Sequence, residues 1–159
     1  MEINAQLIEE VILTHHTEER WRRRDLERIA WIQSPKMRKK SKAVRWLNQD
    51  YVDEELHPAL LLLNEIGIPT QYSCAGVSAL DEPEDHSLYA YVTLQETPSS
   101  TLFVHYLMEK MGHRVLIGYE PARKRYDLSS FFIQHNRSFC ILFYHFALKW
   151  QQMIDRRNL

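Results

Sequence analysis

The spacing of apolar residues in the first third of the chain predicts three helices. Apolar side chains recur at three- and four-residue intervals between Asn4 and Leu13, which is the period of one helix face. A second helix is predicted from Thr17, whose hydroxyl suits the N-cap position, to about Ile32. Ser34 followed by Pro35 favours the start of a third helix. Its inward stripe is Met37, Val44 and Leu47.

The middle of the chain changes from a helical period to short strands. A fourth helix ends at Gly67, where glycine suits a left-handed C-terminal cap, and its apolar face is Leu56, Leu60, Leu63 and Ile66. A further helix over Ser100–Met111 joins the second predicted strand to the third, as in a strand-helix-strand crossover. The predicted strands are Thr70–Cys74, Leu88–Leu94, Arg114–Tyr119 and Tyr126–Ile133.

The last predicted helix begins near Ser138 and has a stripe wide enough to be largely buried. Its apolar positions are Cys140, Phe143, Ala147, Trp150 and Ile154. The fold class expected is therefore α+β, with N-terminal helices packed on a small mixed sheet, one strand-helix-strand crossover and a buried C-terminal helix. The 159 residues fit one globular domain, with a basic helical part over 1–48 and an α+β core over 49–159.

The apolar stretches, the first residues and the number of cysteines together favour a cytoplasmic protein. The longest apolar stretch, Phe139–Leu148, is about half the ~20 residues that a membrane helix needs, so no membrane span is predicted. The first residues, Met1–Asn4, lack the basic and apolar regions of a signal peptide, which favours the cytoplasm. Cys74 and Cys140 are too few for a disulfide framework, and reduced thiols agree with that location.

The net charge of −1 conceals a strong asymmetry along the chain. Residues 20–45 contain eleven Lys or Arg against two acidic residues, whereas residues 46–109 contain eleven Asp or Glu and no Lys or Arg. A basic stripe raises the local concentration of phosphate-bearing partners, which favours RNA as a partner. The alternative is that the basic segment docks on the acidic segment of the same chain, or of a second copy. The phosphate-binding candidates are Lys36, Arg38, Lys39, Lys40 and Lys42.

One compact motif, Ser73-Cys74-Ala75-Gly76, stands at the end of a predicted strand. A glycine two residues past the cysteine permits a tight turn in which backbone amides converge on an anion or a ligand carbonyl. These four residues are the candidates for a ligand pocket. The alternatives are that Cys74 is a small buried hydrophobe and that Ser73 caps the turn. Cys140 is interpreted as a core residue.

At this motif the sequence resembles the wybutosine-synthesising methyltransferase family, the third enzyme of that tRNA-modification pathway. Members carry a Ser-Cys-Ser-Gly turn after a helix that ends in Asn. The resemblance covers about residues 36–133, and this chain has Tyr72, Ala75 and Val77 where the family has Ser, Ser and Arg. The features that occur in the same order are Met37–Lys42, Asp53, Leu63-Asn64, Thr70, the 73–76 turn, Tyr89–Leu94, Ser100–Met111 and Gly112-His113-Arg114.

The resemblance implies a single-domain α/β fold and a cytosolic enzyme. Its expected reaction is methyl transfer from S-adenosylmethionine to a hypermodified guanosine of tRNA. Val77 in place of the family's Arg removes the fork-shaped donor best suited to a phosphate or carboxylate.

Metal chemistry is not predicted. His15 and His16 are adjacent and point to different sides of any helix, so they do not form a chelating pair. The acidic run Asp81–His86 lacks the Asp/Asn alternation and the glycine of a calcium loop. Neither glycine-rich phosphate-loop pattern occurs in the chain.

Aromatic residues are the other candidates for contact with nucleic acid. Tyr72, Tyr89 and Tyr91 lie on neighbouring predicted strands, where an open face would stack bases and a covered face would serve the core. The tryptophans of the basic segment are expected to anchor it to the core; they are Trp21, Trp31 and Trp46.

Three functional hypotheses remain open. The first is an RNA-associated, methyltransferase-like protein in which the basic segment holds phosphates and the 73–76 turn lines a pocket. The second is a nucleic-acid-binding module without catalysis. The third is an interaction protein whose basic and acidic segments mediate self-association.

Overall fold

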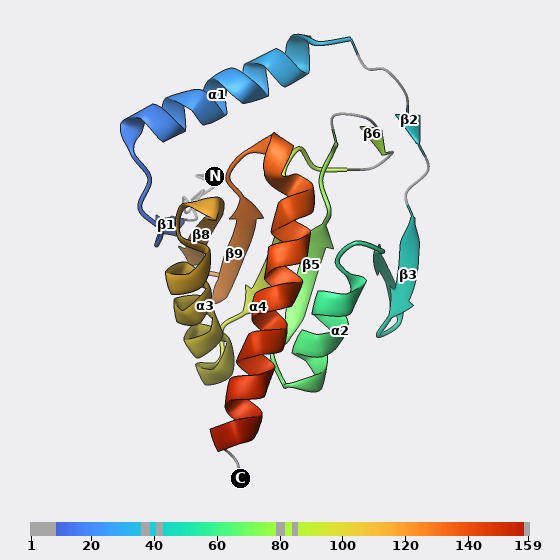
Figure 1. Ribbon diagram of the computed structural model, residues 1–159, viewed down its shortest axis with the longest axis vertical. Helices are drawn as coiled ribbons and strands as arrows, with labels where there is room; N and C mark the ends of the chain where they lie inside the picture. Colours follow the sequence, from blue (N-terminus) through green and yellow to red (C-terminus); the bar gives the residue numbers. More distant parts are fainter. Residues whose placement is uncertain (1–8, 36–38, 41–42, 79–81, 84–85, 158–159) are drawn as a thin grey trace, which may run out of the picture.

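A five-stranded sheet forms the centre of the protein, and every neighbouring pair of its strands is antiparallel. The computed structural model in Figure 1 describes residues 9–35, 39–40, 43–78, 82–83 and 86–157. The strand order is β1-β8-β9-β7-β5. The strands are β1 (Val11–Ile12), β5 (Thr70–Cys74), β7 (Tyr91–Gln95), β8 (Val115–Glu120) and β9 (Arg125–Ser130).

The α+β class is confirmed, and so is the crossover, but this sheet is not mixed. β7 and β8 both pair with β9 in antiparallel register, so they run parallel to each other and are joined through α3 (Pro98–Met111). The prediction of a mixed sheet failed because β9 lies between β7 and β8. β9 follows β8 after a short turn at residues 121–124. A short turn pairs consecutive strands as an antiparallel hairpin, which keeps β7 and β8 apart.

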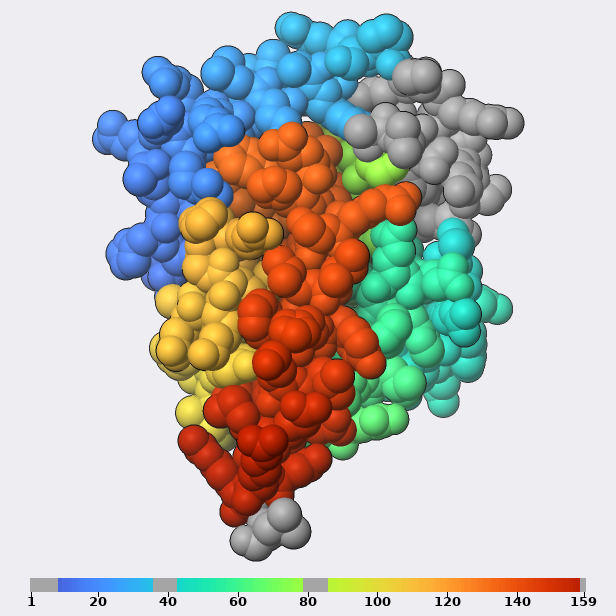
Figure 2. Space-filling view, viewed as in Figure 1, coloured from blue at the N-terminus to red at the C-terminus, as the bar shows by residue number. Residues whose placement is uncertain are grey.

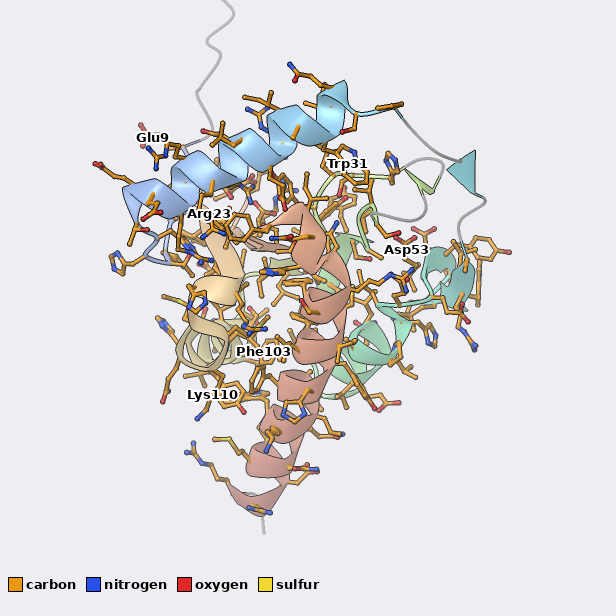
Figure 3. The ribbon with its side chains drawn as sticks, turned by 45° about the horizontal axis from the view of Figure 1, so that its top comes forward. Glu9, Arg23, Trp31, Asp53, Phe103 and Lys110 are labelled. Carbon is orange, nitrogen blue, oxygen red and sulfur yellow. The ribbon has the colours of Figure 1, made fainter. Side chains whose placement is uncertain are left out.

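Three helices cover one face of the sheet (Figure 1). They are α2 (His57–Glu65), α3 and α4 (Asn136–Arg157), and Figure 2 shows them as one continuous surface. Phe103 of α3 lies against α4 (Figure 3), where its ring is 6.0 Å from that of Phe143 in an edge-to-face contact. Both side chains are fully buried. The predicted burial of the last helix is therefore confirmed.

The helices of the core were predicted closely. The predicted fourth helix corresponds to α2, and Gly67 follows it with a φ of +81°. α3 begins at Pro98 after the cap residue Thr97, slightly earlier than the predicted start at Ser100. The Ser100 hydroxyl instead completes a capping box, because it accepts from the Thr97 backbone amide.

The basic N-terminal part was predicted as helices, and only one of them is present among the described residues. α1 (Glu18–Gln33) is confirmed, with the Thr17 hydroxyl accepting from the Arg20 amide at 3.2 Å. Residues 4–8 of the predicted first helix lie outside the described residues, and Val11–Ile12 forms β1 beside β8. A short apolar run is compatible with a strand as well as with a helix turn. Here the run forms a strand because it pairs with the edge of β8.

The predicted third helix is wrong. Residues 36–38 lie outside the described residues, and strands follow: β2 (Lys39–Lys40), β3 (Val44–Leu47) and β4 (Asp50–Asp53). β3 and β4 form a hairpin through Asn48 and Gln49, whose φ angles are +48° and +70°. Asparagine tolerates this left-handed backbone, and a two-residue turn of this kind matches the twist of a hairpin. β2 pairs in parallel with β6 (Glu82–Pro83).

The described residues between 9 and 53, named here the N-terminal strap, lie around the core (Figure 1). β1 pairs along one edge of the sheet, α1 crosses the end of the core, and the β3–β4 hairpin lies beside α2. Most residues in the first two turns of α1 are charged, and α1 has no fully buried residue. It therefore contacts the end of the core rather than a face of the sheet. Among the described residues, no helix has the length and apolar character needed to cross a membrane.

Candidate functional site

The predicted turn at the end of β5 lies inside the protein. Cys74, Ala75 and Gly76 are buried, and Ser73 is half-buried opposite Val92 of β7. Gly76 has a φ of +77°, in the left-handed region that favours glycine. A Cβ atom at this position would lie 2.6 Å from the Ala90 backbone nitrogen, so glycine also permits a close approach of two backbones.

Asn136, the first residue of α4, ties this turn to the sheet. Its side-chain amide donates to the carbonyls of Val77 and Leu88, each at 2.8 Å. Its side-chain oxygen accepts from the Ala90 amide at 2.9 Å and from the Ser130 hydroxyl at 2.6 Å. Asn136 is 2% exposed, and these bonds use both of its donors and both acceptor positions. The sequence reasoning missed this residue; the available signal was a polar residue directly before the predicted buried helix.

The two cysteines are buried in the core and have partners or surroundings that belong to the protein itself. The Cys74 sulfur accepts from the backbone amides of Gly76 and Ser87, at 3.5 and 3.3 Å. Burial, with smaller contributions from Glu55 and Asp53, raises the pKa of the Cys140 thiol to about 12. Cys140 is therefore a neutral thiol at pH 7, in agreement with its interpretation as a core residue.

A buried carboxylate supports the turn from the other side. Asp53, at the end of β4, is 6% exposed and accepts from the Ala75 backbone amide at 2.7 Å. The hairpin is thereby connected to the 73–76 turn. The backbone amide of Ala75, which the sequence analysis offered to a ligand, already donates to a side chain of the protein.

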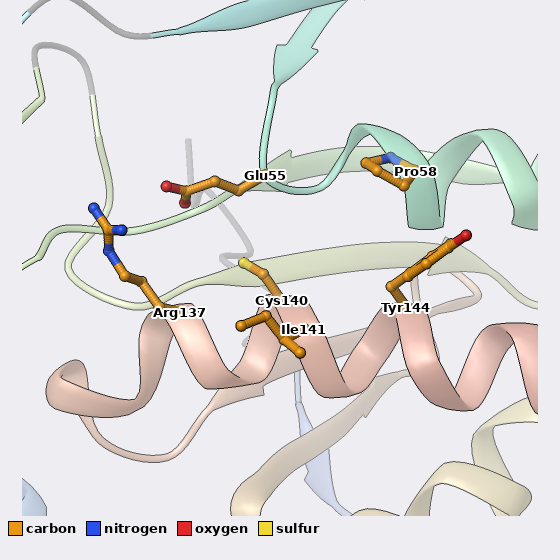
Figure 4. Close-up of a pocket in the computed structure, with 6 residues that line it drawn as sticks. All are labelled: Glu55, Pro58, Arg137, Cys140, Ile141 and Tyr144. Carbon is orange, nitrogen blue, oxygen red and sulfur yellow. The ribbon is translucent and has the colours of Figure 1, made fainter.

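A pocket of about 290 Å³ lies between α2 and α4 (Figure 4). Glu55 and Arg137 extend toward each other at one end, and Pro58 and Tyr144 lie at the other. A guanidinium, a carboxylate and a phenol ring suit a ligand with a flat ring and polar substituents. The lining residues are Glu55, Pro58, Arg137, Cys140, Ile141 and Tyr144. The turn residues Ser73, Cys74, Ala75 and Gly76 are not among them, and their role toward a ligand stays a prediction.

Part of the basic charge of α1 is used to dock the helix. The Arg24 guanidinium lies 3.8 Å from the centre of the Tyr89 ring and donates to the Phe131 carbonyl at 2.6 Å. Arg20 donates to the His113 carbonyl at 2.8 Å. The Glu27 carboxylate accepts from the Ile133 amide at 2.5 Å. Through Arg24 and Glu27, α1 therefore docks on Tyr89 and on the apolar segment 131–133.

The predicted phosphate ligands occupy the segment after α1. Lys36, Arg38 and Lys42 lie outside the described residues. Lys39 and Lys40 form β2, whose register places Lys39 opposite Glu82 of β6. The basic run thus meets the acidic segment of its own chain at this strand pair, as the docking alternative expects at this point. Phosphate binding by these five residues stays a prediction.

The structure gathers further basic residues where α1 crosses the end of the core. Arg20 and His113 are joined by the hydrogen bond above, and both contribute with Arg114 to the environment of His135. Burial first, and then Arg114, lowers the pKa of His135. This cluster escaped the sequence reasoning because its members are far apart in the chain.

His16 connects β1 to this end of the molecule and gives a testable pH dependence. Its ring stacks on Phe131 at 4.2 Å, and its Nε2 is 2.9 Å from the Thr14 hydroxyl. Burial, and then Arg20, lowers the pKa of His16 from 6.5 to about 4. As pH falls, the unfolded chain takes up this proton first, so we expect stability to decrease between pH 6.5 and 4.

The check is thermal melting at the two ends of that pH range. His16→Gln should lose less of its melting temperature on acidification than the unsubstituted protein, since the substituted site no longer titrates. His145→Gln, on the exposed side of α4, is the matched control and should keep the original pH dependence. Equal acid sensitivity of His16→Gln and the unsubstituted protein would contradict the assignment.

The aromatic candidates divide between the core and the surface. Arg24 covers Tyr89, whereas Tyr72 is 61% exposed on the edge strand β5. Trp21 contacts Phe131 at 5.1 Å, as expected of an anchor. Trp46 was also predicted to be an anchor, and this is wrong: its side chain is 58% exposed. Strand alternation is the reason, because the neighbouring Leu47 packs against the core instead.

Three carboxylates meet on the sheet face opposite the helices. Oxygen atoms of Glu10, Glu120 and Asp127 lie within 4.8 Å of one another. Burial and the nearby Glu120 carboxylate raise the pKa of Asp127 to about 6. The Arg125 guanidinium, 2.7 Å from Glu120, already supplies positive charge to this group. The residue types suit a hard divalent cation, but an acidic cluster alone does not define a metal site.

Comparison with known proteins found no matching family model, no matching curated protein and no matching solved structure.

Proposed function

We propose that this protein binds RNA, with the basic part of the N-terminal strap contacting phosphates and the pocket between α2 and α4 holding a nucleoside-type group. The observation that carries this proposal is the separation of charge along the chain. Residues 20–45 have eleven basic side chains against two acidic ones. Dense positive charge on one segment gives sequence-independent affinity for nucleic acid through release of condensed counterions.

The placement of the arginines on α1 supports phosphate contact. Arg20 and Arg24 are turned toward the core, whereas Arg22 and Arg23 are exposed. Arg114 adds a further exposed cation at the same end of the molecule. An RNA backbone lying along α1 would therefore meet cations from the helix and from the end of the core together.

The pocket supports the nucleoside part of the proposal. Tyr144 offers a ring on which a base can stack, and the Glu55 carboxylate can accept from an exocyclic amino group or a ribose hydroxyl. Arg137 can pair with a phosphate or a carboxylate. The pocket volume of about 290 Å³ is just below the ~300–1,000 Å³ that is common for ligand pockets, which limits the bound group to about the size of a nucleoside.

Methyl transfer to tRNA is the more specific form of the proposal, and the resemblance to the wybutosine-synthesising family is its support. In this form of the proposal, Tyr144, Glu55 and Arg137 would hold the adenine, ribose and carboxylate of S-adenosylmethionine, which would then be the nucleoside-type group of the pocket. The bound cofactor would supply an electrophilic methyl group, with S-adenosylhomocysteine as the leaving group and a proton released to solvent. Calorimetry with S-adenosylmethionine distinguishes an enzyme from a binding module.

The phosphate contacts are tested by removing charge from the basic segment. Lys39→Ala, Lys40→Ala and Lys42→Ala together should reduce the salt slope of RNA binding by roughly two to three units, because each lost phosphate contact removes about 0.9 from the slope on a duplex. The measurement is the dissociation constant for an RNA hairpin at several salt concentrations. The melting temperature is measured alongside, and a change of less than about 0.5 kcal/mol in stability is expected of substitutions that only remove phosphate contacts.

The matched control removes the same charge elsewhere. Lys110→Ala, Lys149→Ala and Arg156→Ala are exposed substitutions outside the basic segment and should leave the slope nearly unchanged. If the first triple variant binds RNA as the parent does while its dimerisation or melting changes, the basic segment is a protein-docking surface. The self-association hypothesis then replaces this proposal.

A further inference from the structure

The β3–β4 hairpin displays two large aromatic rings to solvent. Trp46 is 58% exposed and Tyr51 is 64% exposed. The two residues are paired across the strands, with ring centres 4.9 Å apart in an edge-to-face contact. Tryptophan is highly buried on average, so a tryptophan more than half exposed is an informative exception. An edge-to-face pair also leaves ring faces open for a third ring.

The hairpin holds these rings on a supported frame. On the opposite side of its strands, Leu47 and Val52 pack against the core. The Arg45 guanidinium donates to the Glu54 carboxylate at 3.0 and 3.2 Å, which links the start of β3 to the residue after β4. Rings held in advance lose little freedom when a ligand stacks on them.

The position of the hairpin relates it to the two parts of the proposed RNA site. In the sequence, the basic residues 36–42 precede β3, and β4 is followed within two residues by Glu55, which lines the pocket. Along the chain, the aromatic pair therefore stands between the segment proposed to hold phosphates and a residue of the pocket proposed to hold a nucleoside.

We propose that Trp46 and Tyr51 form a stacking platform for an unpaired nucleobase of RNA, an inference that rests on the RNA-binding function proposed above. Stacking of a base on an aromatic ring contributes affinity for any base sequence, because every base has a flat aromatic face. Bases inside a duplex are already stacked on each other and do not present a free face. The platform therefore makes the protein prefer single-stranded segments, loops or ends over a continuous duplex.

The charges around the hairpin favour a base over an anionic membrane. Asp50, Glu54 and Glu55 are acidic residues near the aromatic pair in the chain, and all three are exposed. A membrane surface is wide and would bring these carboxylates against anionic headgroups. A nucleobase has no net charge, and the phosphates of the RNA can contact the basic segment instead.

The experiment compares a short unstructured RNA with the duplex of the same sequence. Trp46→Ala should weaken binding of the single strand roughly tenfold, which is the fold-change for about 1.4 kcal/mol of lost stacking. Affinity for the duplex and the salt slope of binding should stay unchanged, because the phosphate contacts remain. Trp46→Phe should keep most of the single-strand affinity, since it retains a ring. Leu102→Ala is the control, because Leu102 is an apolar residue of α3 with a similar exposed fraction of 60%.

The outcomes separate this inference from the proposed function. If the unsubstituted protein binds single-stranded RNA and Trp46→Ala binds it equally well, the platform is overturned and RNA binding stands. A parallel loss of duplex affinity, or a lowered melting temperature in Trp46→Phe as well, would show a structural role and also overturn it. The unsubstituted protein could instead bind neither the single strand nor the duplex, and bind phosphatidylserine vesicles in a way that depends on Trp46. In that case both proposals are wrong and the hairpin is a membrane contact.

Discussion

Replacing Gly76 with valine is expected to destabilise the protein by more than about 4 kcal/mol, a large part of the stability of a typical domain. The φ of +77° is disfavoured for any β-branched residue, at a cost of about 1–3 kcal/mol. A Cβ atom would also lie 2.5 Å from the Asn136 side-chain nitrogen and 2.6 Å from the Ala90 backbone nitrogen. The backbone of Ala90 begins a core strand region and cannot move aside cheaply. Urea unfolding followed by circular dichroism measures the loss.

Gly67→Val separates the two causes. Gly67 has a similar φ of +81°, but a Cβ atom there would meet nothing within 4 Å. The control should therefore show only the cost of the backbone conformation, and Gly76→Val should lose considerably more. Equal losses would mean that the close approach at Gly76 carries no weight. An unchanged melting temperature and unchanged ligand binding in Gly76→Val would mean that the interpretation of the turn is wrong.

Asn136→Ala is expected to cost about 3–5 kcal/mol of the free energy of unfolding. The substitution leaves the Val77 and Leu88 carbonyls and the Ala90 amide without the partner they have now. A buried polar group that loses its partner costs about 1–3 kcal/mol, and several are affected together. Chemical denaturation gives the value, with the exposed Gln134→Ala as a nearby control expected to stay within about 0.5 kcal/mol. A loss below about 1 kcal/mol would show that water replaces the amide easily.

The elements predicted well are those whose pattern has one interpretation. The stripes of α2, α3 and α4 recur over enough turns to fix a helical period, and β5 is bounded by Pro69 and the glycine turn. Val11 to Leu13 is too short for the period to decide, and its state depends on β8, far along the chain. The β3–β4 hairpin was missed because its turn is Asn48-Gln49 rather than a glycine-containing pair.

The site was harder to predict because its parts meet only in three dimensions. The sequence located the 73–76 turn, but nothing near it in the chain indicates that Asp53 accepts from the Ala75 amide or that Asn136 binds the carbonyl of the next residue, Val77. The pocket combines Glu55, from the turn before α2, with Arg137 from the start of α4, and their meeting depends on how the two helices pack. Likewise, the outward direction of Trp46 follows from strand register, which a helical interpretation of the same residues conceals.

The two residues of β1 have a consequence for the behaviour of the protein at high concentration. Leu13 donates to the Ile117 carbonyl at 2.8 Å, and the Thr14 hydroxyl accepts from the Ile117 amide, a contact between residues 103 apart in the chain. Together with the pairing of Val11 and Ile12, these bonds cover an edge of the sheet that would otherwise offer unpaired amides and carbonyls to another molecule. A segment this short adds little to the core. It nevertheless prevents strands of other molecules from pairing with β8, which would lead to aggregation.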